Sequence, residues 1–386
     1  MNPRSAAPPS DWTVLSNLAL VRQAAGDNQG ACRLLRRALR QPGADRAVCL
    51  KNLAMILQQM AEFDEAERCC REALRLTPGD ARTEFTLGVV LLALGRYAEG
   101  WPLHEVRLSY SPPLVRTSVP QWRGERLNGK TVLVHPEGGY GDIFQFCRYV
   151  PMVAAAGGQV FFAVPATLRR VLNSLPGVTE TGPPRINFYC SVMSLPFVFG
   201  TSAETIPPPA RLHADAAPWS DFLAGLAGLK VGLCWAGRPQ PATNGGIEFD
   251  SRRSMRLRDL APLLTVPSCS FVSLQTGPPA AQLTPAAGVH DVSSRLNDWQ
   301  DTANLMAGLD LIVTVDSAVA HLAGTLGRPT WMLDRHGHDW RWLSGRNDSP
   351  WYPALKIYRQ SVAGDWKTPV NAAATALTEM AAAFPP

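Results

Sequence analysis

A repeat of about 34 residues over residues 12–112 constrains this 386-residue chain more than any other feature. Ala19, Ala54 and Gly88 are equivalent positions, separated by 35 and 34 residues. Small residues there let two antiparallel helices approach closely, and a proline ends each unit. Such units bury their faces only by stacking on one another, so the pattern predicts a short right-handed scaffold with a concave side. The other matching positions are Ala31, Ala66 and Gly100, then Ala38, Ala73 and Arg107, and the closing Pro42, Pro78 and Pro112.

This repeat resembles the tetratricopeptide repeat, with Phe63 and Tyr97 at its inter-helix aromatic position. The first unit lacks that aromatic residue, and we expect three units over residues 1–112. Two roles stay open for them. They form a groove that presents a protein or glycan acceptor, or they serve folding and dimerisation, which would make the chain a homo-oligomer.

From Thr131 onward the pattern changes to short β-branched runs that alternate with helical stretches. That alternation predicts parallel sheets with helices on both faces. A linker over residues 113–129 precedes this alternating region, and Trp122 is the expected packing anchor of the linker. A Pro/Ala-rich stretch at 206–218 divides the alternating region in two. We therefore expect an α + α/β chain in which the repeats precede two Rossmann-like lobes, 130–218 and 219–386. Two facing lobes of this kind form a GT-B architecture, with a cleft at the carboxyl ends of the strands. The last helix packs on the second lobe or crosses back to the first.

Composition excludes several classes of protein. The net charge is only +5 and no basic block occurs, so nucleic-acid binding has no electrostatic support. No apolar run approaches the roughly 20 residues that a membrane span needs. We therefore expect a soluble, cytoplasmic chain. The eight cysteines form no CxxC pair, which favours buried free thiols over disulfides or a zinc site.

The first motif with chemical potential runs from His135 to Asp142, in a glycine-rich turn between a strand and a helix. Glycines let backbone N–H groups approach a ligand, and a helix N-terminus favours negative charge. Asp142 is then either a helix cap or a carboxylate that faces the cleft as a general base. The neighbouring residues predicted to form the acceptor-side loop are Gly139, Tyr140, Gly141 and Gln145.

The second motif is a buried strand from Leu311 that ends at Asp316 and passes directly into a helix. The free N–H groups at the helix start would point at a phosphate, with the helix dipole behind them. Ser317 adds a hydroxyl, and His321 lies one turn further on the same face. A cap for Asp316 and simple packing for His321 are the alternatives. The predicted contacts are Asp316, Ser317, Ala318, Val319 and His321.

A third set of residues suits the binding of anions and of a base. Arginine matches phosphate with two parallel hydrogen bonds, which makes Arg238, Arg252 and Arg253 candidates. Gln275, at the end of a strand, is a candidate contact for a base or ribose. The remaining candidates near these residues are Trp235, Gly237 and Ser254. The tryptophan-rich stretch 339–353 either forms a sugar or base platform or packs against the final helix, with Asp339 and Arg341 as weaker site candidates.

The stretch LMAGLDLIVTVDSAVAHLAGTLGRPTWML resembles the nucleotide-binding signature of glycosyltransferase family 9, the lipopolysaccharide heptosyltransferase family. Gly141-Asp142, before a helix with Arg148 and Pro151, resembles that family's N-terminal motif. Roughly residues 12–370 resemble bacterial proteins that fuse tetratricopeptide repeats to such a domain, including NDWQDTA and DWRWLSGRNDSPWYP. The chain is also similar to protein O-GlcNAc transferases. One departure is Ser-Ala-Val after Asp316, where heptosyltransferases usually have Thr/Ser-Gly.

The resemblance implies a GT-B fold, a nucleotide-diphosphate sugar as donor substrate and no obligatory metal or other cofactor. It also implies Asp142 as the base and the segment from Asp316 to His321 as the donor diphosphate site. The resulting hypothesis is an inverting glycosyltransferase whose acceptor is a protein presented by the repeats. The alternatives are a non-catalytic scaffold, or a transferase that acts on a saccharide or lipid-linked glycan and uses its repeats for docking or dimerisation.

Overall fold

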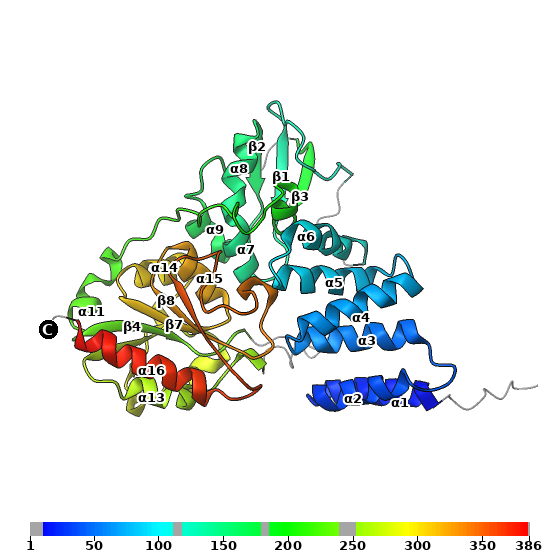
Figure 1. Ribbon diagram of the computed structural model, residues 1–386. Coiled ribbons are helices and arrows are strands. Elements are labelled where there is room, and N and C mark those ends of the chain that lie inside the picture. Colours follow the sequence, from blue (N-terminus) through cyan, green and yellow to red (C-terminus); the bar gives the residue numbers. More distant parts are fainter. Residues whose placement is uncertain (1–10, 111–117, 179–184, 239–251, 385–386) are drawn as a thin grey trace, which may run out of the picture. The chain divides into compact units, whose positions relative to one another are not determined.

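The computed structural model describes residues 11–110, 118–178, 185–238 and 252–384. The chain forms two compact units (Figure 1). The repeat unit contains the N-terminal helices up to residue 110 together with the later segment Gly337–Ser344. The α/β unit contains the residues in between and those from Gly345 onward.

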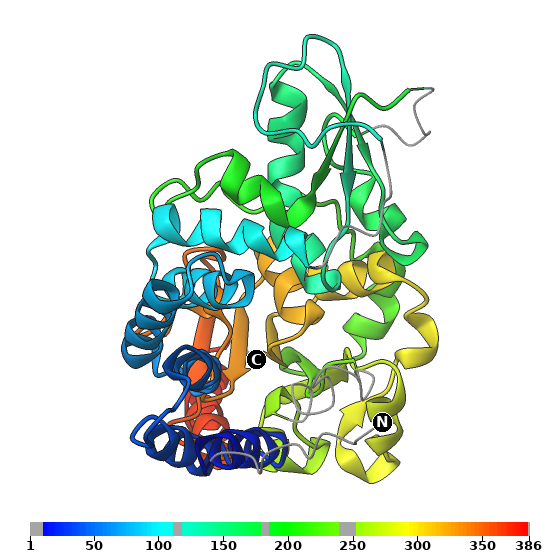
Figure 2. The same ribbon diagram turned by 90° about the vertical axis from the view of Figure 1, so that its right-hand side faces the viewer.

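Three helical hairpins make up most of the repeat unit, and Figure 2 shows them stacked in chain order from dark blue to cyan. Aspartates cap three of the helices, since Asp27, Asp45 and Asp80 each accept a hydrogen bond from a backbone N–H of the first turn. The helices are α1 (Asp11–Ala24), α2 (Asn28–Ala38), α3 (Arg46–Gln59), α4 (Phe63–Leu76), α5 (Ala81–Ala93) and α6 (Tyr97–Glu105), followed by the 3-10 turn η1 (Val106–Ser109).

The predicted small positions lie where the helices of a hairpin approach each other. A Cβ atom on Gly88 would come within 2.8 Å of the backbone nitrogen of His104, and one on Gly100 within 2.8 Å of the Leu92 side chain. Both distances are too short for any side chain, so these two positions require glycine. Ala19 and Ala54 are buried at the equivalent places in the first and second hairpins. The prediction of an N-terminal region of helical repeats is confirmed, and small residues lie where the helices of each hairpin meet.

The segment Gly337–Ser344, which we call the docked segment, packs on the turns of the second and third hairpins. Trp340 lies edge-to-face on Trp101, with ring centroids 5.4 Å apart, and His338 lies on Phe63 at 5.3 Å. The Ser344 N–H donates to the Ala93 carbonyl at 3.0 Å. We had expected this stretch to pack against the final helix or to line the nucleotide site. In residues 337–344, His338 and Trp340 pack on aromatic rings of the repeats.

The first lobe of the α/β unit is built on a parallel three-stranded sheet in the order β2-β1-β3. Trp122, the predicted linker anchor, is buried beside this sheet, and its backbone N–H donates to the Tyr189 carbonyl at 2.8 Å. The strands are β1 (Thr131–His135), β2 (Gln159–Phe162) and β3 (Phe188–Ser191). The helices are α7 (Tyr140–Phe146), α8 (Val150–Ala155), α9 (Ala166–Leu172) and α10 (Leu195–Val198), with the 3-10 turns η2 (Cys147–Tyr149) and η3 (Val192–Ser194).

The second lobe has a parallel six-stranded sheet in the order β6-β5-β4-β7-β8-β9. Its strands are β4 (Leu229–Cys234), β5 (Cys269–Ser273), β6 (Val289–His290), β7 (Leu311–Val315), β8 (Thr330–Asp334) and β9 (Leu355–Arg359). Its helices are α11 (Ser220–Ala224), α13 (Ala261–Leu264), α14 (Trp299–Ala307), α15 (Ala318–Thr325) and α16 (Lys367–Ala382). Its 3-10 turns are η4 (Ala217–Trp219), η6 (Leu257–Leu260), η7 (Pro278–Gln282), η8 (Pro285–Ala287) and η9 (Ser293–Arg295), and η10 (Trp340–Trp342) lies in the docked segment.

The last helix stays with the second lobe. Val370, Ala373 and Leu377 of α16 are buried in the hydrophobic core that β4 and β7 share. From the middle strand β4, the strands are added outward to β5 and β6 on one side and then to β7, β8 and β9 on the other. In open α/β sheets, ligands bind at the carboxyl ends of the strands where the strand order reverses in this way. The predicted architecture, a helical repeat region followed by two parallel-sheet lobes, is confirmed.

All eight cysteines are free thiols and seven are buried, as the sequence predicted. Burial raises the pKa of Cys70 and of Cys147 to about 12. Within the ranges that the structure describes, no helix is both long and apolar enough to cross a lipid bilayer.

Candidate functional site

The two lobes of the α/β unit meet where α7 and α15 come together. Gly141, in the first turn of α7, lies against the ring of His321 on α15. A Cβ atom at Gly141 would be 2.6 Å from His321 Cδ2. The His321 ring is buried, and its Nδ1 is 3.0 Å from the Tyr352 hydroxyl. Thus the two motifs that the sequence singled out are joined in space, with a glycine required at the contact.

Asp142 is the residue after that glycine, and it is half-buried at the start of α7. Its Oδ2 accepts a hydrogen bond from the Gly139 N–H at 2.6 Å. Gly138 has a positive φ of 75°, and a Cβ atom there would collide with the same carboxylate at 2.2 Å. The glycine turn is therefore folded around Asp142. The N-cap residue of α7 is Gly139, and Asp142, three residues further on, reaches back to its N–H, which fixes the carboxylate beside the contact between the lobes.

The N-terminus of α15 is arranged as the second motif predicted. Ser317 is the N-cap residue, and its Oγ accepts from the Val319 N–H at 3.3 Å and lies 3.1 Å from Thr314 Oγ1. Asp316 and Val319 are buried on either side, and Ala318 is half-buried. A helix start of this kind offers backbone N–H groups and the positive end of the helix dipole to an anion.

Arg253 links the loops that follow β4 and β7. Its Nη1 donates to the Asp316 carbonyl at 3.3 Å, and its Nη2 donates to the Arg238 carbonyl at 3.5 Å. Gly237 lies under the guanidinium, because a Cβ atom there would be 2.4 Å from Arg253 Nη2. The Gly237 N–H donates to Ser254 Oγ at 3.0 Å. Arg253, Gly237 and Ser254 are thus gathered at the carboxyl ends of the neighbouring strands β4 and β7.

Three further candidate side chains, Gln275, Trp235 and Gln145, are also buried. Gln275 Oε1 accepts from the N–H groups of Trp235 and Ala236, at 3.2 and 2.9 Å, and therefore supports the loop after β4. The Trp235 ring belongs to the hydrophobic core of the second lobe. Gln145 is fully buried within α7. These buried side chains therefore support the residues around the site from the interior of the protein.

Arg335 is a functional candidate that the sequence prediction missed. β7 and β8 pair with Val315 opposite Leu333, so Ser317 and Arg335 each stand two residues beyond that pair. Arg335 is buried, and its charge together with burial lowers the pKa of Arg252. Burial is the main cause that raises the pKa of the adjacent Asp334 to about 6, even though Arg359 Nε donates to its Oδ2 at 2.9 Å. In the sequence, the only signal for Arg335 is its position directly after a buried strand.

Arg148 joins the lobes next to α7. Its Nη1 donates to the carbonyl oxygens of Trp351 at 2.9 Å and Pro207 at 3.0 Å, and its guanidinium lies over the rings of Trp351 and Tyr352. Thr325 Oγ1 adds a hydrogen bond to the Phe144 carbonyl at 3.1 Å. These buried contacts hold α7 against the second lobe.

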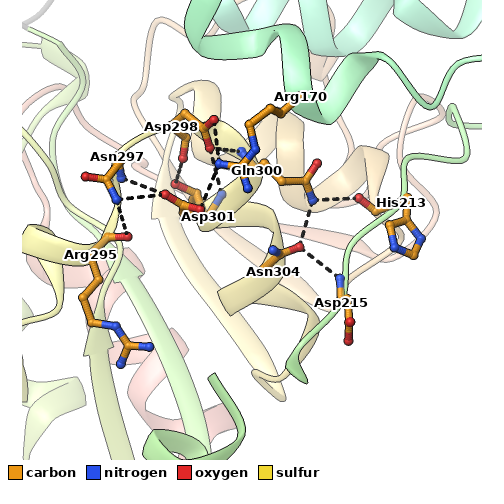
Figure 3. A network of polar contacts seen from close by, with 10 residues as sticks. Arg170, His213, Asp215, Arg295, Asn297, Asp298, Gln300, Asp301 and Asn304 are labelled. Carbon is orange, nitrogen blue, oxygen red and sulfur yellow. Dashed lines mark hydrogen bonds and ion pairs between the residues drawn. The ribbon is translucent and has the colours of Figure 1, made fainter. Parts of the chain in front are cut away.

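The NDWQDTA stretch, which sequence analysis had noted only as a matching motif, contacts the first lobe (Figure 3). Asp298 caps α14. Arg170 of α9 forms ion pairs with Asp298 at 2.9 Å and with Asp301 at 3.2 Å. Gln300 Nε2 donates to the His213 carbonyl of the interlobe linker at 3.0 Å, and Trp299 packs on Tyr140, with ring centroids 5.8 Å apart. The predicted acceptor-side loop is thus held from the second lobe.

Asp339 and Arg341, which we had placed with the nucleotide site, lie in the docked segment of the repeat unit. Asp339 caps the turn η10, and its Oδ1 accepts from Arg341 Nη1 at 2.8 Å. The Arg341 guanidinium lies over the Trp340 ring, 4.4 Å from its centroid. They therefore pair with each other there.

No trio of histidine, cysteine or acidic side chains in the described parts of the chain is arranged to bind a metal ion. The site as found offers arginines, a helix N-terminus and one half-buried carboxylate. That set can neutralise a diphosphate and accept a proton.

Family models match two parts of the chain. Residues 14–47 and 47–80 match models of the tetratricopeptide repeat. Residues 292–333 match glycosyltransferase family 9 (heptosyltransferase). The chain thus contains stretches similar to tetratricopeptide repeats and one stretch similar to family 9 heptosyltransferases. That segment spans α14, β7, α15 and most of β8, and so includes the helix start at Ser317.

Among curated proteins, the chain is 28% identical over 420 residues to Protein FlbA of Caulobacter vibrioides, a match that covers 96% of this chain and 66% of FlbA. The chain therefore spans about two thirds of the length of that relative. Among solved structures, ADP-heptose lps heptosyltransferase II of E. coli matches 64% of this chain and 96% of its own, with 14% identity and a TM-score of 0.45. The O-GlcNAc transferase of Thermobaculum terrenum matches 98% and 93%, with 15% identity and a TM-score of 0.29.

The close approach at Gly141 yields a prediction with a matched control. Gly141→Ala should lower the free energy of unfolding by about 1–3 kcal/mol, because the buried His321 ring cannot move away from the new methyl group. Gly139→Ala adds the same methyl group two residues earlier, where its nearest neighbour is 3.7 Å away, and should leave stability nearly unchanged. Chemical denaturation of both variants measures the difference. Equal stabilities would show that α7 and α15 do not meet at this glycine.

Proposed function

We propose that this chain transfers a sugar from a nucleotide-diphosphate donor to an acceptor hydroxyl, without a metal ion and with inversion at the anomeric carbon. The observation that supports it most is the meeting of two helix starts, one bearing Asp142 and one bearing Ser317, through the contact of Gly141 with His321. The family 9 match over the Ser317 helix supports the same class of reaction.

In this mechanism the donor diphosphate binds at the N-terminus of α15. Arg253, which already spans the loops after β4 and β7, neutralises the leaving diphosphate together with Arg238 and Arg252. The acceptor oxygen attacks the anomeric carbon as the bond from that carbon to the diphosphate oxygen breaks. Asp142 takes the hydroxyl proton, and the two lobes hold the reactants in line.

The acceptor is a protein or glycan presented by the repeats. Tetratricopeptide repeats stack into extended surfaces that suit the binding of a polypeptide, and three hairpins are present. A saccharide or lipid-linked acceptor remains the alternative within the same reaction class, and glycosylation of separated acceptor pools distinguishes them.

The role of Asp142 can be separated from its capping role by Asp142→Asn. The amide oxygen of asparagine can still accept from the Gly139 N–H, so the turn is kept while the base is lost. Turnover should fall by about 10²–10⁴-fold with unchanged donor affinity. Asp221→Asn, on the exposed surface of the same unit, is the control. Turnover at the wild-type rate in Asp142→Asn would remove this residue as the base.

Donor binding is tested by titrating the full chain with UDP, GDP, ADP and CMP and following its thermal unfolding. One nucleotide should stabilise the wild-type chain, and Arg253→Ala should weaken its binding about tenfold or more, since a charge-assisted contact is lost. Arg258→Ala removes an arginine whose side chain is 74% exposed a few residues away, and should bind like wild type. A chain that binds none of these nucleotides would favour the non-catalytic scaffold.

The metal-independent step predicts that activity persists after dialysis against EDTA. Guanidinium groups supply the positive charge that a divalent cation would otherwise bring to the diphosphate. Initial rates with and without the chelator are the measurement. Loss of activity in EDTA, restored by added Mg²⁺ or Mn²⁺, would contradict it.

A further inference from the structure

Tyr352 lies in a chain of buried contacts within the α/β unit. Its hydroxyl is 3.0 Å from Nδ1 of His321, and the two rings meet edge-to-face with centroids 5.7 Å apart. The Arg148 guanidinium lies over the Tyr352 ring, 5.0 Å from its centroid. His321 belongs to α15 and Arg148 to η2, the turn that directly follows α7. Tyr352 therefore contacts both of the segments that begin at the two sequence motifs.

The Tyr352 ring is fixed by the residues around it. Gly324 of α15 leaves room for the ring, since a Cβ atom there would be 2.5 Å from Tyr352 Cδ1 and Cγ. The Tyr352 N–H donates to the Ser349 carbonyl at 3.3 Å, and its own carbonyl accepts from the Leu355 N–H at 3.0 Å, at the start of β9. Because protein interiors are closely packed, the hydroxyl keeps its place beside Nδ1 of His321.

The opposite edge of the His321 ring faces the start of α7. A Cβ atom on Gly141 would be 2.6 Å from His321 Cδ2 and 3.2 Å from His321 Nε2. Side chains on a helix lean toward its N-terminus, which carries this ring over the turn that begins at Ser317. Nε2 is therefore directed to the place where the starts of α7 and α15 meet, one residue before Asp142 in the chain.

The contacts of the ring favour one tautomer of His321. A neutral imidazole carries its proton on one nitrogen, and the hydrogen bond made by the other nitrogen decides which. A phenol hydroxyl donates more readily than it accepts, and the positive charge of Arg148 over the ring makes the hydroxyl of Tyr352 more acidic. The positive end of the α15 dipole disfavours a second proton on the imidazole. Nδ1 is then the acceptor, and Nε2 carries the proton.

We propose that the Tyr352 hydroxyl holds His321 in the tautomer with its proton on Nε2, and that this N–H donates a hydrogen bond to the leaving diphosphate of the donor. His321 is the residue that binds the donor, and Tyr352 is a positioning residue that acts through it. This role rests on the proposed function, which places the diphosphate at the start of α15. A fixed N–H beside the leaving oxygen stabilises the charge that develops there.

Nitrogen NMR of the full chain, with isotope-labelled histidine rings, tests the tautomer. The His321 signals, assigned as those missing from His321→Ala, should show a protonated Nε2 and a bare Nδ1. In Tyr352→Phe the hydrogen bond to Nδ1 is lost, so the signals should show a mixture of both tautomers. Tyr358→Phe is the matched control, because it removes a hydroxyl that has no hydrogen-bond partner among the described residues from another buried tyrosine. Its His321 signals should match those of wild type.

The affinity for the nucleoside diphosphate that wild type binds, from UDP, GDP and ADP, tests the role in donor binding. Tyr352→Phe should weaken binding about fivefold and His321→Ala about tenfold, since one neutral and one charge-assisted hydrogen bond are lost. The double variant should bind like His321→Ala alone, because the tyrosine acts only through the histidine. Circular dichroism confirms that each variant is folded. If the alanine variant does not fold, His321→Gln replaces it, and its affinity should not depend on Tyr352.

A proton on Nδ1 in the wild-type chain would overturn the inference, as would wild-type affinity in Tyr352→Phe. A further loss of affinity when Tyr352→Phe is added to the His321 variant would also overturn it. In each of these cases the proposed function stands. A wild-type chain that binds none of the three nucleotides would overturn the proposed function and the binding role of His321 together.

Discussion

The packing of α7 on α15 is the contact on which the site depends. Each helix begins at the carboxyl end of a parallel strand, in different sheets, so neither helix alone defines a cleft. Their approach is possible only because position 141 lacks a side chain, and it is secured by His321, Tyr352 and the buried Arg148. The Asp142 carboxylate and the helix start at Ser317 are brought together as a result of packing, before any ligand is considered.

The electrostatics of the second lobe follow from that geometry. Arg253, from the loop after β4, reaches the Asp316 carbonyl at the N-terminus of α15, where the helix dipole has the same positive sign. A concentration of positive charge in a protein with a net charge of only +5 is a local feature. It supports the proposal of a small, highly charged anion as the ligand, in contrast to the extended basic surface that a nucleic acid requires.

Much of the fold could be predicted from the sequence because its signals are local. Small residues at a 34-residue spacing predicted the hairpins, and β-branched runs predicted each strand. The Asp142 turn and the Ser317 helix start were found from strand-to-helix junctions. The docked segment could not be found this way, because Phe63 and Trp101 are more than 230 residues from their partners in the chain. Arg335 was missed for a related reason. An arginine directly after a strand can be assigned to a site only once the strand order shows which residues lie beside it.

The chain enters the repeat unit twice, once at its start and again at residues 337–344. The repeats therefore cannot be detached by cutting the chain at one place. A fragment that starts after the repeats would expose Trp340, Trp342 and Leu343 to water, all of which are buried in the intact chain. Such an apolar loop favours aggregation.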